Sequence, residues 1–312
     1  MPRITPKTFW SILVDSYNGF TEDRGLKLSA ALAYYTVFAL APLLVMIIAL
    51  ASVFFGEEAI QGQIFSEINE LVGNEAARQI QEMIKQVQLS GKTTVAVVTS
   101  VITLLVGATS VFVEIQDSIN LIWRVKAKPK RGWVKLLCDR LLSSSLIISL
   151  GFLLVVSLII NGLILALSNR LTLYLPNITV FLVKLVNLII SLGVVTTLFG
   201  TIFKVLPDVK ISWRDVRWGA IFTAMMFMLG RYLIGLYIET TGTGSTYGAA
   251  GSLIVILVWI YYTAAILYFG AEFTQVNADK NGRRIRPAEY AVYVERREAE
   301  RVVDTLPPVH KQ

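Results

Sequence analysis

Six long apolar stretches, separated by polar segments, dominate the hydrophobic pattern of this chain. Each is at least as long as the roughly 20 residues that an α-helix needs to cross a bilayer. The pattern therefore predicts an all-α, polytopic membrane protein whose six transmembrane helices form a single membrane domain over residues 1–276. The stretches run approximately over residues 28–55, 93–113, 141–168, 178–203, 219–238 and 249–271.

The polar segments carry helical patterns of their own. Residues 1–27 contain a Thr5-Pro6 helix start followed by apolar side chains every three to four residues. This predicts a helix that lies either in the membrane interface or on the protein's own surface. Residues 56–92 show two apolar stripes separated by Gly73-Asn74, which predicts an amphipathic helical hairpin, with a plain surface loop as the alternative. The polar tail, residues 277–312, is expected to form a helix over about 288–304.

The Lys and Arg residues are distributed unevenly between the two sides of this topology. Of 29, 23 lie in the N-terminal segment, the second and fourth connecting segments and the tail, while four lie in the other connecting segments. By the positive-inside rule, both termini are therefore expected on the cytoplasmic side. The composition agrees with a membrane protein, with 54% hydrophobic residues, 16% charged residues and a mean hydropathy of +0.61.

The net charge of +7 is mostly a consequence of this topology. The cations are spread over four segments without interleaved aromatic residues, which argues against nucleic acid and favours anionic membrane lipid as the neighbour. The only histidine is His310, so histidine-based catalysis and His-rich metal sites are excluded. We therefore expect a protein that is not an enzyme and that needs no metal or cofactor.

Two further cations, Lys184 and Arg231, lie inside the apolar stretches. Both are roughly 10 Å inside the outer boundary, at 1.5 Å per helical residue, and Asn161 and Asn187 lie at a similar depth. Ionisable groups at such depth usually face a protein interior or a wet cavity, so these four residues form a candidate binding layer. The alternatives are that Lys184 reaches outward to the surface and that Arg231 pairs with Glu239.

Three acidic residues lie near the opposite, inner end of the predicted bundle. Glu114 and Asp117 are three residues apart on one helix face, and Glu272 follows the sixth apolar stretch. They are expected either to cluster and close the inner end or to pair with nearby arginines. Pro42, near the middle of the first stretch, removes a backbone hydrogen bond and predicts a kink that can open a cavity.

A set of aromatic, glycine and polar motifs is spread over residues 10–277. It comprises residues 29–35 with Pro42, Asn120 and Trp123, Pro207, Trp218-Gly219-Ala220, Tyr237, Tyr247-Gly248, residues 259–262, and Gly270-Ala271-Glu272. This combination resembles the YihY/BrkB family of bacterial inner-membrane proteins. The resemblance implies six helices, cytoplasmic termini and a role in the transport of lipids or lipopolysaccharide precursors. Some members carry the label ribonuclease BN, which the family received in error, and this chain shows no nuclease constellation.

Together these features predict a protein that transports or exposes an anionic amphipathic lipid through a cavity with a cationic layer in its outer half. The partners expected are membrane lipids, with further copies of the chain or other envelope proteins as additional candidates. Two alternatives stay open: a non-transporting scaffold for envelope complexes, and a channel or exporter for small anions.

Overall fold

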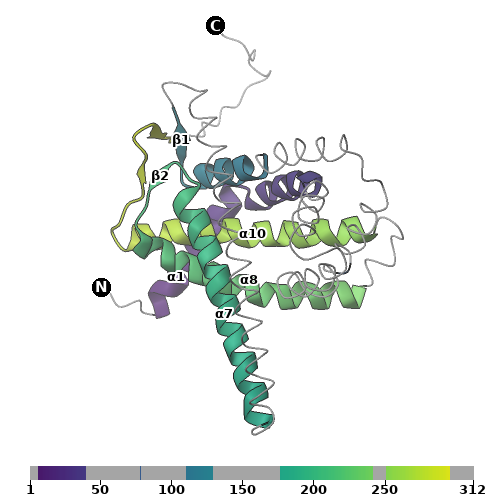
Figure 1. Cartoon of the computed structure of the whole chain (residues 1–312). Helices are drawn as coiled ribbons and strands as arrows, with labels where there is room; N and C mark the ends of the chain where they lie inside the picture. The colour runs from purple at the N-terminus through teal and green to yellow at the C-terminus, as the bar shows by residue number, and fades with distance from the viewer. Residues whose placement is uncertain (1–5, 40–77, 79–109, 129–175, 242–250, 296–312) are drawn as a thin grey trace, which may run out of the picture.

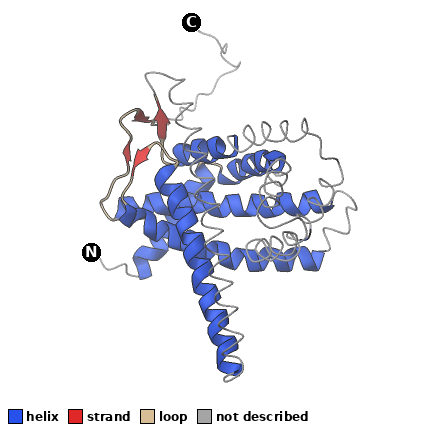
Figure 2. Cartoon of the chain, viewed as in Figure 1, coloured by secondary structure: helices blue, strands red, loops and turns tan. Residues whose placement is uncertain are grey.

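The computed structural model describes residues 6–39, 78, 110–128, 176–241 and 251–295. This part of the chain is mostly helical, and its short strands gather at one end of the molecule (Figures 1 and 2). Pro42, Asn161 and, apart from residue 78, the predicted hairpin over residues 56–92 lie outside the described residues.

Three long helices correspond to the predicted fourth, fifth and sixth membrane spans. They are α7 (Pro176–Val205), α8 (Trp213–Thr241) and α10 (Gly251–Lys280). Each is long and apolar enough to cross a membrane. Shorter described helices cover residues 25–39 and 110–122, within the predicted first span and at the end of the predicted second. The multi-pass helical fold is thus confirmed, with three spans in the described residues.

Helices α8 and α10 lie side by side and run in opposite directions (Figure 1). Their contact uses two small residues and two threonines in a reciprocal arrangement. A Cβ atom built on Gly219 would lie 1.8 Å from Thr274 Oγ1, and one built on Gly270 would lie 2.0 Å from Thr223 Oγ1. Each threonine hydroxyl donates a 2.7 Å hydrogen bond to a backbone carbonyl of its own helix. Because glycine has no side chain, the two backbones can approach closely here, as is common between membrane helices.

The N-terminal helix α1 (Pro6–Glu22) packs on α10. Ile12 and Ser16 are buried in this contact. On the opposite face, Trp10, Val14 and Tyr17 are exposed and follow one another at helical spacing. One face of the helix therefore packs on the protein, as one of the two predicted placements requires, while the exposed apolar stripe leaves contact with the membrane interface a prediction.

Helix α7 crosses α8 and α10 at a steep angle, and its N-terminal part extends beyond them (Figure 1). Its C-terminal half contributes Val195, Phe199 and Phe203 to the core. Phe199 meets Phe227 of α8 edge to face, with ring centroids 5.9 Å apart, a favourable aromatic arrangement. This contact holds α7 against α8 near the end where the strands lie.

Two short antiparallel ribbons tie the tail to that end. Strand β1 (Val125–Ala127) pairs with β4 (Ala291–Tyr293), and β2 (Val209–Lys210) pairs with β3 (Arg286–Pro287). The helix predicted from residue 288 is therefore wrong over residues 291–293, which are extended. Pairing with a strand more than 100 residues earlier in the chain overrides the local helical tendency, and residues 296–304 of that prediction lie outside the described part.

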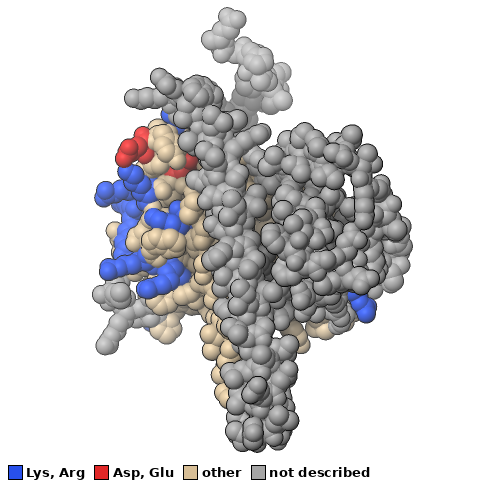
Figure 3. All heavy atoms as spheres, viewed as in Figure 1, with Lys and Arg blue, Asp and Glu red and all other residues tan. Residues whose placement is uncertain are grey.

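The four segments predicted to share one side of the membrane meet at this same end. Helix α1, the β1 segment, the link from α7 to α8 and the tail beyond α10 are in mutual contact through the ribbons and the α1–α10 packing. Figure 3 shows Lys and Arg side chains gathered on it. We call it the basic end. That the four segments lie together agrees with the charge pattern, and which side of the membrane they face stays a prediction.

Candidate functional site

Two groups of buried polar residues lie near the basic end: Asp23 and Glu272 between α1 and α10, and Asn120 and Asp208 between helix 110–122 and the α7–α8 link. We call these four residues together the polar core. Their exposed fractions are between 2% and 7%. Buried polar groups are costly unless they are hydrogen-bonded, so the contacts of each member indicate how the core is held.

Glu272 of α10 is the member of the polar core that packs against α1. Its side chain lies directly against the backbone of α1, since a Cβ atom on Gly19 would be 2.8 Å from Glu272 Oε2. Asp23, in the turn after α1, lies within hydrogen-bonding reach of it, with the charges of Arg124 and Glu22 nearby. Within the described residues, Glu272 Oε1 has no hydrogen-bond partner.

Arg124 is the cation closest to this acidic group in the described chain. It adopts a left-handed conformation, with φ of 55°, that ends helix 110–122, and its guanidinium donates to Glu22 Oε1 at 3.1 Å. Burial alone would lower the pKa of Arg124, but the hydrogen bond to Glu22 and the charges of Asp23 and Glu22 outweigh it and raise the pKa. The pair thus joins the end of α1 to the start of β1.

Asp208 forms the second half of the polar core, in the link between α7 and β2. Its carboxylate accepts from Asn120 Nδ2 at 2.8 Å and from Gln116 Nε2 at 3.2 Å. The backbone N–H of Asp208 in turn donates to Asn120 Oδ1 at 2.8 Å. This reciprocal contact between Asn120 and Asp208 fixes helix 110–122 to the α7–α8 link.

Two further polar contacts bind the long helices to the same end. Trp123 Nε1 donates to the carbonyl oxygen of Ala271 at 3.0 Å. Arg283, just beyond α10, pairs with the buried Asp215 in the first turn of α8 at 3.0 Å. Polar contacts therefore link helix 110–122, α8, α10 and the tail to one another at the basic end.

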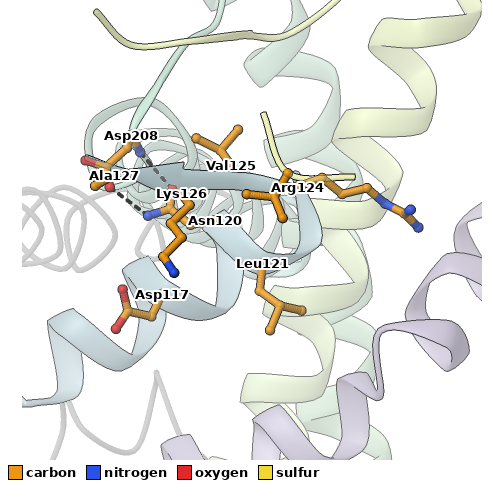
Figure 4. A pocket seen from close by; sticks show the side chains of 9 residues that line it. Asp117, Asn120, Leu121, Arg124, Val125, Lys126, Ala127 and Asp208 are labelled. Carbon is orange, nitrogen blue, oxygen red and sulfur yellow. Dashed lines mark hydrogen bonds between the residues drawn. The ribbon is translucent and has the colours of Figure 1, made fainter. Parts of the chain in front are cut away.

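The other two acids predicted for the inner end lie on helix 110–122. Glu114 is beside Ser118, whose hydroxyl donates to it at 3.4 Å, and beside Tyr268, one turn before Glu272 on α10. Asp117 is exposed and lines an open cleft of about 480 Å³ together with Arg124, Lys126 and Asp208 (Figure 4). The three acids thus lie at separate positions. Glu272 of α10 faces Asp23, whereas Glu114 and Asp117 lie at two other places on helix 110–122.

The predicted outer layer is distributed over α7 and α8. Arg231 lies on the inward face of α8: it follows the buried Phe227 by four residues and precedes the buried Ile234 by three, whereas Leu229 and Tyr232 are exposed. Arg231 itself is half-buried. It makes no hydrogen bond or ion pair with any part of the chain that the structure describes.

Helix α7 carries Lys184 and Asn187 one turn apart in its N-terminal half. Asn187 Oδ1 is buried and has no hydrogen-bond partner in the described chain. Counted along the helices, Lys184 is eight residues after the start of α7 and Arg231 ten residues before the end of α8. At 1.5 Å per residue these are about 12 and 15 Å from the helix ends that lie away from the basic end.

Sequence reasoning missed Asp23, Asp208 and Gly19, although all three shape the polar core. Each depends on contacts between segments that are far apart in the chain, and none belongs to a local motif for an acid site. A signal was present for Asp208, because it follows Pro207, one of the positions on which the family resemblance rests. The motif residues Asn120, Trp123, Ala271 and Glu272 likewise converge here.

Comparison with known proteins identifies the family of this chain. The family model described as virulence factor BrkB matches residues 16–292. The chain belongs to this family. A UPF0761 membrane protein of Azotobacter vinelandii is 30% identical over 88% of this chain and 65% of its own length.

A UPF0761 membrane protein of Pseudomonas aeruginosa is likewise 30% identical, over 81% of this chain and 59% of its own length. The chain therefore spans about three fifths of the length of these curated relatives. No solved structure matches the chain. Membership of the BrkB family establishes a membrane protein with transmembrane helices, and the matched range includes α7, α8, α10 and every residue of the polar core.

Proposed function

We propose that this BrkB-family protein moves or exposes an anionic amphipathic lipid across the bacterial inner membrane, with both of its termini in the cytoplasm. The headgroup would be held by Arg231 while the acyl chains stay in the bilayer, and Lys184 and Asn187, on the part of α7 that extends beyond α8 (Figure 1), would contact the lipid at a separate point of its path. Asn161, outside the described residues, is the fourth proposed member of this layer. The observation that carries the proposal is the position of Arg231 on the inward face of a membrane-spanning helix.

A charged side chain within a membrane span is expensive, and such residues commonly mark a pathway for ions or substrates. The cost is reduced when the charge is paired, yet Arg231 has no such partner in the described chain. A guanidinium in this state suits a phosphate or carboxylate, because its planar fork can bind two oxygens at once. An anionic headgroup is therefore a natural counter-ion for Arg231.

The polar character of the layer is supported by Asn187. An amide oxygen that is buried without a hydrogen bond costs free energy, and it favours a water molecule or a polar ligand at its surface. Lys184, on the same helix and one turn away, would add a second positive charge. A phosphate oxygen can accept from Lys184 Nζ or from Asn187 Nδ2, whereas the buried Oδ1 needs a donor, such as a water molecule or a headgroup hydroxyl.

The contacts at the basic end support a path that is closed at that end. The polar core and the two ribbons interlock α1, helix 110–122, the α7–α8 link and the tail at the basic end. We propose that Glu114, Asp117 and Glu272 take part in closing this end, and that Pro42 supplies a kink in the first span. An amphipathic lipid would then reach Arg231 from the bilayer or from the outer side.

The test is lipid translocation in proteoliposomes that contain a trace of fluorescent anionic lipid, read by quenching the label from outside. We expect the protein to increase translocation over protein-free vesicles. Arg231→Gln should reduce the rate on the order of tenfold, which corresponds to about 1.4 kcal/mol, whereas Arg231→Lys should keep part of it. The matched control is Tyr232→Leu, which changes the neighbouring, exposed residue.

Two results would contradict the proposal. Wild-type protein that moves no more lipid than empty vesicles would support a scaffold instead. Arg231→Gln at the wild-type rate would remove the assigned site. Anion flux without lipid movement, measured in the same vesicles, would assign the layer to a small-anion pathway and reject lipid as the cargo.

A further inference from the structure

A second feature that could bind lipid lies between α7 and α8 near the basic end, away from Arg231. A cleft of about 280 Å³ opens between the two helices. Thr196, Thr197 and Gly200 of α7 line one wall, and Val216, Ala220 and the first turn of α8 line the other. The cleft is a consequence of small residues: a Cβ atom on Gly200 would have ordinary contacts of 3.6 Å with Ala220 and 3.9 Å with Val216.

The body of the cleft is apolar. The Thr197 hydroxyl donates to the carbonyl oxygen of Gly193 in its own helix at 2.8 Å, so its polar group is satisfied within α7. Val216 and Ala220 contribute only aliphatic surface. Apart from the Thr196 hydroxyl, the wall presents mostly apolar surface, and it suits a flexible hydrocarbon chain.

The mouth of the cleft is cationic. Arg214 and Arg217, three residues apart in the first turns of α8, both line it and are exposed. The acid in this turn, Asp215, is buried and pairs with Arg283. Neither Arg214 nor Arg217 has an ion pair within the described residues. Two unneutralised cations at the positive end of a 29-residue helix favour an anion at the mouth.

The depth of the mouth matches a lipid headgroup. Trp213 and Trp218 flank it and are 59% and 49% exposed, and Arg217 lies over the ring of Trp218, 5.9 Å from its centroid. Exposed tryptophans and arginines at the start of a membrane-spanning helix mark the boundary between hydrocarbon and headgroups. The apolar cleft extends from this boundary toward the hydrocarbon side, over about 10 Å from residue 213 to residue 220.

We propose that the α7–α8 cleft is a binding site for an anionic phospholipid of the leaflet at the basic end. Its headgroup phosphate is bound by Arg214 and Arg217, and the part of one acyl chain nearest the headgroup lies in the cleft beside Gly200. The site is separate from the layer at Arg231 and does not depend on translocation. The two cations at the mouth select a negatively charged headgroup, and the apolar wall behind them selects an acyl chain. The occupant is therefore a phospholipid with net negative charge.

The experiment measures lipid binding to the purified full chain by native mass spectrometry, with titration of phosphatidylglycerol or of phosphatidylcholine. We expect a clear preference for phosphatidylglycerol. Replacing Arg214 and Arg217 with Gln should weaken its binding roughly thirtyfold, or about 2 kcal/mol, at about 1 kcal/mol for each cation near a membrane surface. The matched control replaces Arg284 and Arg286, which are exposed at the same end, with Gln and so removes the same charge.

A second variant tests the cleft itself. Gly200→Leu fills the space for the acyl chain and should reduce binding of phosphatidylglycerol while both arginines remain. Gly200→Ala fits without a clash, so it should fold and give a smaller loss. Equal binding of the two lipids, an equal loss in the Arg284/Arg286 control, or unchanged binding in both Gly200 variants would each overturn the proposal. Because binding is read at equilibrium, none of these results depends on whether the protein moves lipid.

Discussion

The reciprocal packing of α8 on α10 gives the sharpest prediction of stability. In Gly219→Ala, the new methyl group would lie 1.8 Å from Thr274 Oγ1 and 2.8 Å from Thr274 Cβ. The hydroxyl can rotate away only by giving up its 2.7 Å hydrogen bond to the carbonyl of Gly270. The Cβ atom cannot rotate away, so the helices must separate by roughly 0.6 Å to restore an ordinary contact.

The expected cost follows from these two terms. Overpacking of this kind costs about 1–3 kcal/mol. Loss of the Thr274 hydrogen bond adds about 0.6 kcal/mol, the average for side-chain hydrogen bonds in membrane helices. We therefore expect Gly219→Ala to reduce the free energy of unfolding by about 2–4 kcal/mol. The control is Gly235→Ala in the same helix, where nothing lies within 4 Å of the new Cβ. There the better helix propensity of alanine should stabilise the protein by about 0.5–1 kcal/mol.

The assay is reversible unfolding by sodium dodecyl sulfate in mixed micelles, followed by circular dichroism. A double-mutant cycle with Thr274→Gly isolates the contact, because that change removes the atoms that the methyl group meets. In this background Gly219→Ala should lose most of its penalty. If Gly219→Ala were as stabilising as Gly235→Ala, or if the penalty persisted in the Thr274→Gly background, the helix contact would be incorrect.

Three further predictions concern the basic end. Asn120→Ala leaves the buried Asp208 without two of its hydrogen bonds and should destabilise the protein by about 2–4 kcal/mol in the same detergent assay; a change below 0.5 kcal/mol would contradict this contact. Arg24 has a φ of 55°, so Arg24→Gly should raise the midpoint of unfolding slightly because glycine tolerates this conformation, and a lower midpoint would refute it. The hydrogen bond from Lys210 and its charge lower the pKa of Glu289; the small stabilisation should be present above the ordinary pKa of 4.5 and be lost as the pH falls below it, so that wild type and Glu289→Gln become equally stable at low pH.

Much of the architecture could be predicted from the sequence because membrane burial leaves a local signal. Long apolar stretches marked α7, α8 and α10, and the uneven Lys and Arg distribution correctly grouped four segments at one end. The end of α10 was less visible. The helix continues to Lys280, and Thr274 and Asn277 in its last turns are buried. Gly282, in the turn that follows, has a φ of 69°, which suits a residue without a Cβ atom.

The tail and the polar core were harder to predict for a common physical reason. Residues 291–293 form a strand only because residues 125–127 offer a partner, and no local pattern encodes that pairing. Glu272 was recognised as a candidate, but its neighbours Gly19 and Asp23 come from the far N-terminal helix. Propensity and hydropathy describe single segments, whereas a buried polar contact is a property of two.

The two proposed lipid sites use the same chemistry at different depths. Arg214 and Arg217 lie at the start of α8, and Arg231 lies about four to five turns further along the same helix, at 3.6 residues per turn. The first pair sits on the exposed surface beside a cleft, and Arg231 sits on the inward face. Separate variants can therefore test surface binding and passage without changing each other's residues.

The central claim is that Arg231 faces a hydrated path, and cysteine accessibility tests it most directly. Arg231→Cys, in a Cys138→Ser background, is treated in proteoliposomes with a charged, membrane-impermeant thiol reagent added from either side. Thiols react as thiolates, so labelling requires water at that depth. Thr223→Cys, inside the helix contact, and Tyr232→Cys, on the exposed face of α8, are the controls. The proposal predicts that Arg231→Cys is labelled from the side opposite the basic end while both controls stay unlabelled. Arg231→Cys that resists labelling from both sides would contradict it.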